Sequence, residues 1–474
     1  MNAAFQAFCT SVQTDSHLWG WLLGGWLAYL LGLGLWIILQ KREPAATLAW
    51  LISLAALPYV GFLIYYVFGP QRIRRQRLRR GRVRARMPSS PVADSADSRE
   101  LARLSTATTR LPPSTATDVR LLIDGAATYD ALLEAIAQAQ EHVHLEYYIV
   151  EPDRTGAALR DALVERARAG VKVRLLLDAV GSARMSRRFL APLLDAGGEI
   201  ARFHPMRLPW RRPWLNLRSH RKIVIVDGRI AFTGGINITD AQDERLSAEA
   251  YRDLHLRLEG EVVGTLQLVF AEDWVYATGD RPPGLPVPLA TPGPVQAQVL
   301  TSGPDSAWET IHRVQVAAIH AAKQRVWLAT PYFVPGEAAM MALTSAALAG
   351  LDVRLLVPHR SDSRLVTFAA RSYFDELLAA GVRIHEYGPR LLHTKALLVD
   401  DDIAVIGSAN FDHRSFRLNF EVSVLFHDAG VAEALAELFQ RDGHQSPRVR
   451  PDRRRSLWRH RLPEALARLL SPLL

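Results

Sequence analysis

The sequence predicts an α/β protein of two homologous lobes with pseudo-two-fold symmetry, each a sheet flanked by helices, preceded by a two-helix transmembrane hairpin. Three observations support this prediction. One motif occurs twice with the same internal spacing. Short apolar runs typical of buried strands alternate with helical stretches around both copies, which indicates α/β layers. Two long apolar segments, 18–39 and 45–68, lie near the N-terminus.

The repeated motif begins with a histidine and ends with an asparagine. In each copy a lysine follows the histidine by two residues, an aspartate by seven, a pair of small residues from fourteen and an asparagine by seventeen. The first copy comprises His220, Lys222, Asp227, Gly234, Gly235 and Asn237, and the second His393, Lys395, Asp400, Gly407, Ser408 and Asn410. Two matches with one spacing indicate a duplicated functional site.

The spacing of the motif has a physical interpretation. Residues 223–226 and 396–399 are apolar runs typical of buried strands, and residues i and i+2 of a strand face the same side. The histidine and lysine of each copy therefore point together. Asp227 and Gly228 form a turn signal that folds 230–233 back as a second strand and returns Asn237 toward the histidine. A histidine, a fixed cation and an amide donor on one face suit a phosphate group.

Other classes of site are less compatible with the motif. A lone His-x-Lys is usually only the edge of a strand, but the duplication disfavours that interpretation. A metal site is disfavoured because each lysine would repel a cation, and the sequence has no HExxH motif or Cys/His cluster. The single cysteine, Cys9, excludes a disulfide framework. We expect neither metal nor cofactor.

The two HxKxxxxD motifs, each followed by G(G/S)xN, resemble the phospholipase D superfamily. The resemblance implies two phospholipase D-like lobes and cleavage of a phosphodiester through a covalent phosphohistidine, without metal. Two lobes facing each other would place both histidines across one phosphate, because double displacement at phosphorus needs a nucleophile and an acid. The resemblance favours His220 as nucleophile and His393 as general acid and base. The expected phosphate-binding residues are Lys222, Lys395, Asn237, Asn410, Gly235 and Ser408.

A histidine used in this way needs a partner for its other ring nitrogen. Glu421 follows His393 at the spacing where similar family members carry an orienting acid, so we expect it to orient His393. The first lobe has Ala248 at the matching position, and Asp253 is the expected substitute for His220. Asp227 and Asp400 belong to the catalytic motif, although we interpret them as structural turn and ion-pair residues.

The N-terminal 71 residues are expected to form a transmembrane hairpin. Each apolar segment is long enough to span a bilayer as a helix. Buried core helices, or a signal peptide for the first segment, are the alternatives. Residues 1–17 carry no Lys or Arg, the loop at 41–42 carries two, and 72–86 carry nine Arg. This asymmetry predicts catalytic lobes on the cytoplasmic side of a bacterial inner membrane.

The remaining chain is divided by composition and by repeats. Residues 72–118 are expected to be an Arg-rich juxtamembrane segment and a linker, 119–285 and 295–445 the two lobes, and 279–294 their connection. The offset between matching residues is 184 at Pro205 and Pro389 but 173 at the histidines, so the first lobe carries 11 additional residues. This insertion, within 206–219, is rich in Trp and Arg and is either a lipid-headgroup contact or a solvated loop.

The C-terminal segment, 446–474, is basic and amphipathic. It is expected to be an interfacial helix, with a packed terminal helix as the alternative. The whole chain has a net charge of +9. Residues 448–474 contribute +6 and the nine Arg of 72–86 contribute +9, so the rest of the chain has a net charge of −6. The basic character is therefore local, which favours an anionic membrane surface and disfavours nucleic acid as a partner.

Within the superfamily, the sequence is most similar to the bacterial cardiolipin synthase family. The stretches KREPAATLAW, EYYI, RLLLDAVGS, RSHRKIVIVDG and LARLLSPLL carry this resemblance. It implies transfer of a phosphatidyl group from one phosphatidylglycerol to another, giving cardiolipin and glycerol. A hydrolase or transphosphatidylase that uses water or another alcohol is the alternative, as is a non-catalytic scaffold. The oligomeric state stays open.

Overall fold

The computed structural model describes residues 20–21, 24–39, 44–56, 96–204, 217–279, 291–451 and 455–471. The chain divides into two compact units, one of residues 1–71 with 210–216 and the other of the remaining residues. The second unit contains both predicted lobes, apart from residues 210–216.

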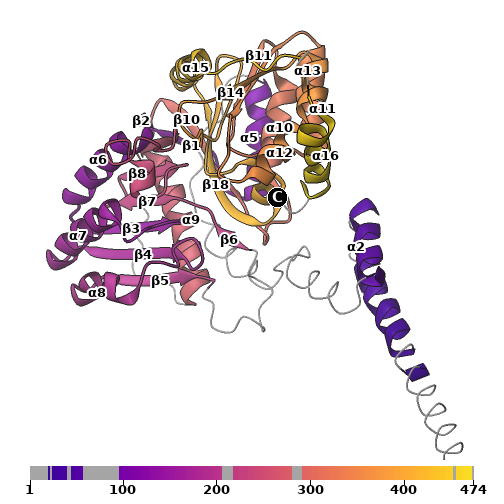
Figure 1. The fold of residues 1–474 in the computed structure, drawn as a ribbon. Coiled ribbons are helices and arrows are strands. Elements are labelled where there is room, and N and C mark those ends of the chain that lie inside the picture. The colour runs from indigo at the N-terminus through magenta and orange to yellow at the C-terminus, as the bar shows by residue number, and fades with distance from the viewer. Residues whose placement is uncertain are drawn as a thin grey trace, which may run out of the picture. The chain divides into compact units, whose positions relative to one another are not determined.

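The first lobe is built on a seven-stranded sheet (Figure 1). Its strands, in spatial order, are β2 (Asp118–Ile123), β9 (Leu254–Glu259), β8 (Ile230–Gly234), β7 (Ile223–Val226), β3 (His142–Tyr147), β4 (Lys172–Asp178) and β5 (Glu199–Phe203). Strands β3, β4 and β5 are parallel, and the predicted β7–β8 hairpin pairs Val226 with Ile230. All four residues of β7 are buried, as expected for a strand covered on both faces.

The second lobe repeats this order strand for strand. Its matching strands are β10 (Val295–Ser302), β18 (Asn419–His427), β16 (Ile403–Gly407), β15 (Ala396–Val399), β11 (Arg325–Ala329), β13 (Asp352–Pro358) and β14 (Arg383–Tyr387). Two short strands join this sheet from outside the lobe, β1 (Ser114–Ala116) beside β10 and β6 (Arg218–Ser219) beside β18. A separate small pair is β12 (Phe333–Val334) with β17 (Phe411–Asp412). The predicted pair of homologous α/β lobes is confirmed.

Helices cover both faces of each sheet. The outer face of the first sheet packs on α6 (Asp124–Ala137), α7 (Arg154–Arg168) and α8 (Arg187–Asp195). The outer face of the second sheet packs on α5 (Ala96–Thr109), α10 (Thr310–Ala321), α11 (Glu337–Leu348), α12 (Arg364–Arg371) and α13 (Phe374–Ala380). The inner faces share one core with α9 (Glu261–Thr278) and α15 (Ala429–His444), which joins the lobes. Short helices η4 (Asp240–Gln242) and α14 (His413–Arg417) lie in loops.

The segment before the first lobe differs from the expected linker. Its described residues form α5 and β1, and Leu101 of α5 is buried in the core of the second lobe. Ser and Thr side chains of α5 donate to the backbone one turn earlier. The helix forms despite a composition typical of a linker because its apolar side packs on the second lobe. The Arg-rich run 72–86, most of the Trp/Arg insertion and residues 280–290 lie outside the described residues.

The described part of the N-terminal unit contains a helix over 24–38 and α2 (Pro44–Ala56). Ile37 and Leu54 are buried where these two helices pack against each other. Among the described residues, no helix has both the length and the apolar character needed to cross a membrane. Both predicted spans, 18–39 and 45–68, extend beyond those residues.

The C-terminal segment forms η5 (Leu457–Arg461) and α16 (Leu462–Leu469). Ala467 belongs to the core of the second lobe, and Arg455 pairs with Asp375 and with the buried Glu464. The helix is therefore packed on the lobe. Its leucines nevertheless face outward, since Leu466 is 55% and Leu469 76% exposed.

Candidate active site

The backbone of each motif histidine is held by the opposite lobe. His220 lies between β6 and β7, and its N–H donates to the carbonyl of Phe420 on β18 at 2.9 Å. The N–H of His393 likewise donates to the carbonyl of Arg252 at 2.7 Å. These matched contacts bring the two halves of the duplicated motif to the junction between the lobes.

The side chains of the histidines also cross between lobes. His220 Nδ1 lies 3.0 Å from Glu421 Oε2, and His393 Nδ1 lies 2.5 Å from Asp253 Oδ2. Asp253 and Glu421 are the two acids that we expected to orient the histidines. We expected each acid to bind the histidine of its own lobe, and this pairing is wrong. The exchange follows from the pairing of β6 with β18, in which Ser219 lies opposite Phe420, so that the next residues, His220 and Glu421, come side by side. Spacing along the chain carries no information about this pairing.

These contacts define the tautomer of each ring. Besides Glu421, the carbonyl of Ser408 lies 3.0 Å from His220 Nδ1, and both groups are acceptors. Nδ1 of His220 therefore carries the proton, and Nε2 keeps its lone pair for attack or proton transfer. His393 Nδ1 lies 2.5 Å from Asp253 Oδ2 and 2.8 Å from Lys395 Nζ, and the carboxylate, as the shorter contact and an acceptor, assigns the same tautomer to His393.

Burial keeps the histidines neutral and weakens the charge of the lysines. Burial lowers the pKa of His220 to about 4. The charge of Lys222 lowers this pKa further, whereas the carboxylate of Glu421 raises it. Burial and the nearby Lys395 lower the pKa of His393. Burial also lowers the pKa of Lys222 to about 7 and that of Lys395 to about 8. A phosphodiester bound here would restore the charge of both ammonium groups.

The lysines lie beside the histidines as predicted. Lys222 Nζ donates to the carbonyl of His220 at 2.7 Å, and Lys395 Nζ donates to that of His393. Lys395 Nζ also lies 3.7 Å from Asp253. Lys222 is fully buried and Lys395 nearly so, which makes each a fixed donor for an anionic oxygen.

The remaining phosphate-binding candidates divide into two groups. Asn237 and Asn410 are buried, and Asn237 Oδ1 accepts from the N–H of Ile149 at 3.2 Å, which directs its amide NH2 elsewhere. Gly235 and Ser408 have a different role from the one predicted. A Cβ at Gly235 would lie 2.1 Å from Asp253 Oδ1, so glycine makes room for that carboxylate. Ser408 holds Glu421 through its hydroxyl.

The motif aspartates lie at the far end of the strands from the histidines. Asp227 accepts hydrogen bonds from the N–H groups of residues 140–142, and Asp400 from those of 323–325. Both have φ near +50°, which a turn requires. The structural turn interpretation is confirmed. The carboxylates of Asp227 and Asp400 hold backbone N–H groups away from the histidines, and a direct catalytic role for them stays a prediction.

Two tyrosines that the sequence analysis missed contact the histidines. The ring centroid of Tyr148 lies 4.9 Å from that of His220, and that of Tyr251 lies 5.4 Å from that of His393. Tyr148 is the second tyrosine of the EYYI stretch, and Tyr251 lies two residues before Asp253. Asp178 and Glu146, also missed, bind the N–H and hydroxyl of Ser219 and so fix the residue before His220.

The described parts of the chain contain no group of three or more His, Cys, Asp or Glu side chains placed to hold a metal ion.

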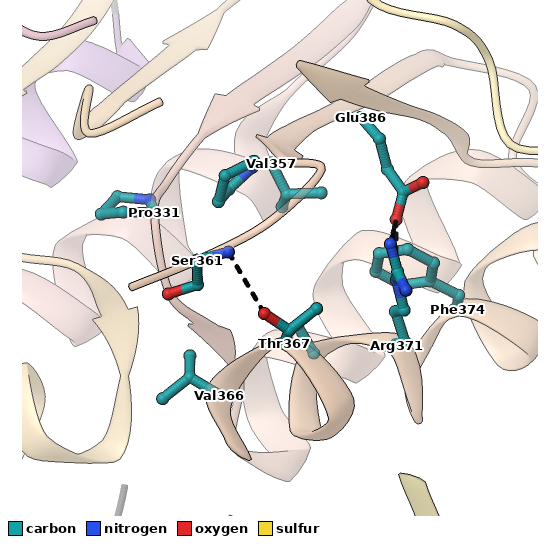
Figure 2. Close-up of a pocket in the computed structure, with 10 residues that line it drawn as sticks. Pro331, Val357, Ser361, Val366, Thr367, Arg371, Phe374 and Glu386 are labelled. Carbon is teal, nitrogen blue, oxygen red and sulfur yellow. Dashed lines mark hydrogen bonds and ion pairs between the residues drawn. The ribbon is translucent and has the colours of Figure 1, made fainter. Parts of the chain in front are cut away.

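A pocket on the second lobe is separate from the histidines. It lies beside α12 and is lined by Pro331, Val357, Pro358, Ser361, Val366, Thr367, Ala370, Arg371, Phe374 and Glu386 (Figure 2). An Arg371–Glu386 ion pair of 2.9 Å occupies one side of it (Figure 2).

Comparisons with known proteins agree with this geometry. The family model described as "Cardiolipin synthase, PLD-like domain" matches residues 132–274 and 316–443, and the model of the phospholipase D-nuclease N-terminal region matches 33–70. A cardiolipin synthase of Geobacillus thermodenitrificans is 42% identical over 92% of this chain and 91% of its own. One from Geobacillus sp. strain WCH70 is 40% identical over 97% of this chain and 96% of its own.

A solved structure shows the same fold. Phosphatidylserine synthase of Haemophilus influenzae superposes with a TM-score of 0.61 at 14% identity, over 79% of this chain and all of its own. The repeated motif, the paired lobes and relatives of about 40% identity over most of both chains lead to one assignment. The chain belongs to the cardiolipin synthase family of the phospholipase D superfamily.

Proposed function

We propose that the chain transfers a phosphatidyl group from one phosphatidylglycerol to a second, giving cardiolipin and glycerol through a phosphohistidine on His220. The observation that carries this proposal is the crossed geometry, in which each histidine is oriented by an acid of the other lobe. The family places the chain among phosphatidyltransferases.

The reaction divides into two displacements at one phosphorus. In the first, His220 Nε2 attacks the donor phosphorus and the bond to the glycerol oxygen breaks. His393 enters this step as the imidazolium, which the bound anionic phosphodiester favours, and gives its Nε2 proton to that oxygen. In the second, His393 takes the proton of the incoming hydroxyl, whose oxygen bonds to phosphorus as the bond to His220 breaks. Lys222, Lys395 and the amides of Asn237 and Asn410 supply positive charge and donors for the non-bridging oxygens.

The acceptor distinguishes this function from hydrolysis. Water or another alcohol at the second step would give phosphatidic acid or a different phospholipid from the same intermediate. We expect purified enzyme in detergent, given phosphatidylglycerol labelled in its acyl chains, to form cardiolipin with one glycerol released per molecule. Phosphatidic acid as the main lipid product would contradict the transferase function and leave the two-histidine chemistry standing.

The same proposal includes a membrane location. Residues 1–71 would anchor the chain as a hairpin in a bacterial inner membrane, ahead of a basic juxtamembrane segment, with lobes 119–285 and 295–445 in the cytoplasm. Exposed apolar side chains support it, among them Trp21, Leu31 and Leu39 in the N-terminal unit. The outward leucines of α16 and the exposed Trp458 suit an anionic lipid surface in segment 446–474.

Reporter fusions test this orientation. A reporter placed after residue 90 should be active only as a cytoplasmic reporter, and one inserted at Glu43 only as a periplasmic reporter. A cytoplasmic signal from the Glu43 fusion would overturn the orientation.

A further inference from the structure

Arg221 lies between His220 and Lys222 in the first copy of the motif, and the two displacements at phosphorus give it no role. Its side chain is among the largest that are fully buried in the described part of the chain, with 2% exposed. A guanidinium charge that is removed from water needs ion pairs and hydrogen bonds in its place. The partners of Arg221 therefore indicate what this residue does.

The guanidinium of Arg221 binds both lobes. Its Nε donates to the backbone carbonyl of Glu421 on β18 at 3.2 Å, and its Nη1 pairs with the buried carboxylate of Asp273 on α9. The guanidinium carbon also lies 5.6 Å from the ring centroid of Phe420. Arg221 thus connects a helix of the shared core to the strand that carries the acid of His220.

Two successive residues of the first lobe bind two successive carbonyls of β18. The N–H of His220 donates to the carbonyl of Phe420 at 2.9 Å, and the side chain of Arg221 donates to the next carbonyl, that of Glu421. The hydroxyl of Ser408 holds the carboxylate end of the same glutamate. Arg221 therefore fixes the backbone from which the side chain of Glu421 reaches His220 Nδ1.

Thr394 is the residue that matches Arg221 in the second copy of the motif. Its hydroxyl donates to the carbonyl of Arg252 at 3.4 Å, and this carbonyl also accepts from the N–H of His393. The contact on the His393 side is therefore a long, uncharged hydrogen bond, made to the residue before Asp253. The two motifs share His, Lys and Asn but differ at this position by a buried charge.

A second buried acid lies in the electrostatic range of this ion pair. Burial and the charge of Asp273 raise the pKa of Glu146 well above its usual value, against the charge of Arg221, which favours the neutral form of Glu146. Arg221 and Asp273 are then one cation and one anion. A balanced pair of this kind can be replaced by two apolar side chains without leaving an unpaired buried charge.

We propose that Arg221 is a positioning residue for the nucleophile, because it holds β18 so that the carboxylate of Glu421 stays on His220 Nδ1 while Nε2 attacks phosphorus. This inference rests on the proposed function only in taking His220 as the nucleophile, and it applies to any acceptor. Without the Nε donor, the backbone at Glu421 loses its tie across the lobe junction. A displacement of about 1 Å in an active site can lower a rate about 10²-fold.

The test is a double-mutant cycle on formation of the phosphohistidine. The rate is measured by rapid quench with a nitrophenyl donor, for Arg221→Lys alone and combined with Glu421→Gln or with Asp253→Asn. We expect Arg221→Lys to lower the rate about 10- to 100-fold alone and in the Asp253→Asn protein. In the Glu421→Gln protein it should lower the rate less than about 3-fold, because the contact through which Arg221 acts is already weakened.

Further variants distinguish positioning from folding. Arg221→Lys keeps a cation for Asp273 but lacks the planar fork that binds two acceptors at once. Arg221→Met combined with Asp273→Leu removes the same donor together with both charges, and should give the same cycle if Arg221→Lys fails to fold. As a control, Arg174→Met removes another buried arginine of the first lobe, which pairs with Glu199 at 3.1 Å, and should leave the rate of the folded enzyme unchanged.

Two results would overturn the proposal. In one, Arg221→Lys lowers the rate by the same factor in the Glu421→Gln and Asp253→Asn proteins, and in the other the folded Arg221→Lys enzyme reacts as fast as the unmodified enzyme. Covalent label on His393 of the unmodified enzyme would instead refute the nucleophile of the proposed function, and the role of Arg221 would be refuted with it.

Discussion

Glu421 of the second lobe binds His220 of the first, with 3.0 Å between Oε2 and Nδ1. In the same way, Asp253 of the first lobe binds His393 of the second lobe. The active site is therefore one unit made by two lobes, in which neither lobe has an oriented histidine by itself.

This crossing predicts which step each acid serves. Glu421→Gln should lower formation of the phosphohistidine roughly 10²-fold or more, because the ring of the nucleophile loses its anionic partner. Asp253→Asn should lower overall turnover by a similar factor but should matter least for a donor whose leaving group needs no proton. Rapid-quench measurement of the covalent intermediate, with a natural donor and a nitrophenyl donor, distinguishes the two. The opposite pattern would contradict the assignment of His220 as nucleophile and His393 as general acid.

Chelation should leave the reaction intact. Lys222 and Lys395 provide the positive charge that a divalent cation would otherwise supply to the phosphate. We expect turnover in excess EDTA to equal turnover without it, after correction for effects on the lipid surface. Activity that is lost to EDTA and restored by a divalent ion at an amount stoichiometric with enzyme would contradict the mechanism.

The pH dependence follows from the buried groups of the site. His220, with a pKa of about 4, must be neutral to attack, so kcat/KM should fall below about pH 4. Lys222 is charged below its pKa of about 7 and loses that charge as the pH rises, so donor capture should weaken above about pH 7. Lys222→Arg keeps its charge and should move the alkaline limb upward. If the alkaline limb is identical in the unmodified enzyme and in Lys222→Arg, the limb reports the titration of another group.

An ion network between the lobes predicts a large effect on stability. Arg252 binds Asp124 at 3.0 Å and Asp442 at 2.9 Å, and Arg390 also binds Asp124. Arg252→Ala should lower the free energy of unfolding by roughly 3–5 kcal/mol, because two buried carboxylates lose a cation. The surface variant Arg120→Ala should cost less than about 1 kcal/mol. Denaturant unfolding measures both, and equal effects would contradict this role of the network.

The sequence predicted those features that depend on local pattern. Duplicated spacing identified the histidines and lysines, and apolar runs identified the strands that carry them. It did not predict the exchange of Glu421 and Asp253, because β6 joins the sheet of the other lobe and strand pairing across lobes leaves no local signal. It also interpreted the Ser/Thr-rich stretch of α5 as a linker, although burial of Leu101 against the second lobe stabilises a helix there.

The roles of Gly235 and Ser408 show the same limit. Their small size was recognised, but the group they accommodate lies on a different strand and comes close only after folding. For Gly235 this group is Asp253, and for Ser408 it is Glu421. A small residue in the sequence predicts that another group approaches its backbone closely, but it does not identify that group.

Trapping the covalent intermediate tests the central claim most directly. Enzyme mixed with phosphatidylglycerol labelled at phosphorus is quenched in alkaline denaturant, which preserves phosphohistidine, and the labelled peptide is identified by mass spectrometry. We predict label on His220, retained in His393→Asn when the donor has a good leaving group and absent from His220→Asn. Acid-labile label on His393 of the His220→Asn protein would contradict the assignment of the nucleophile.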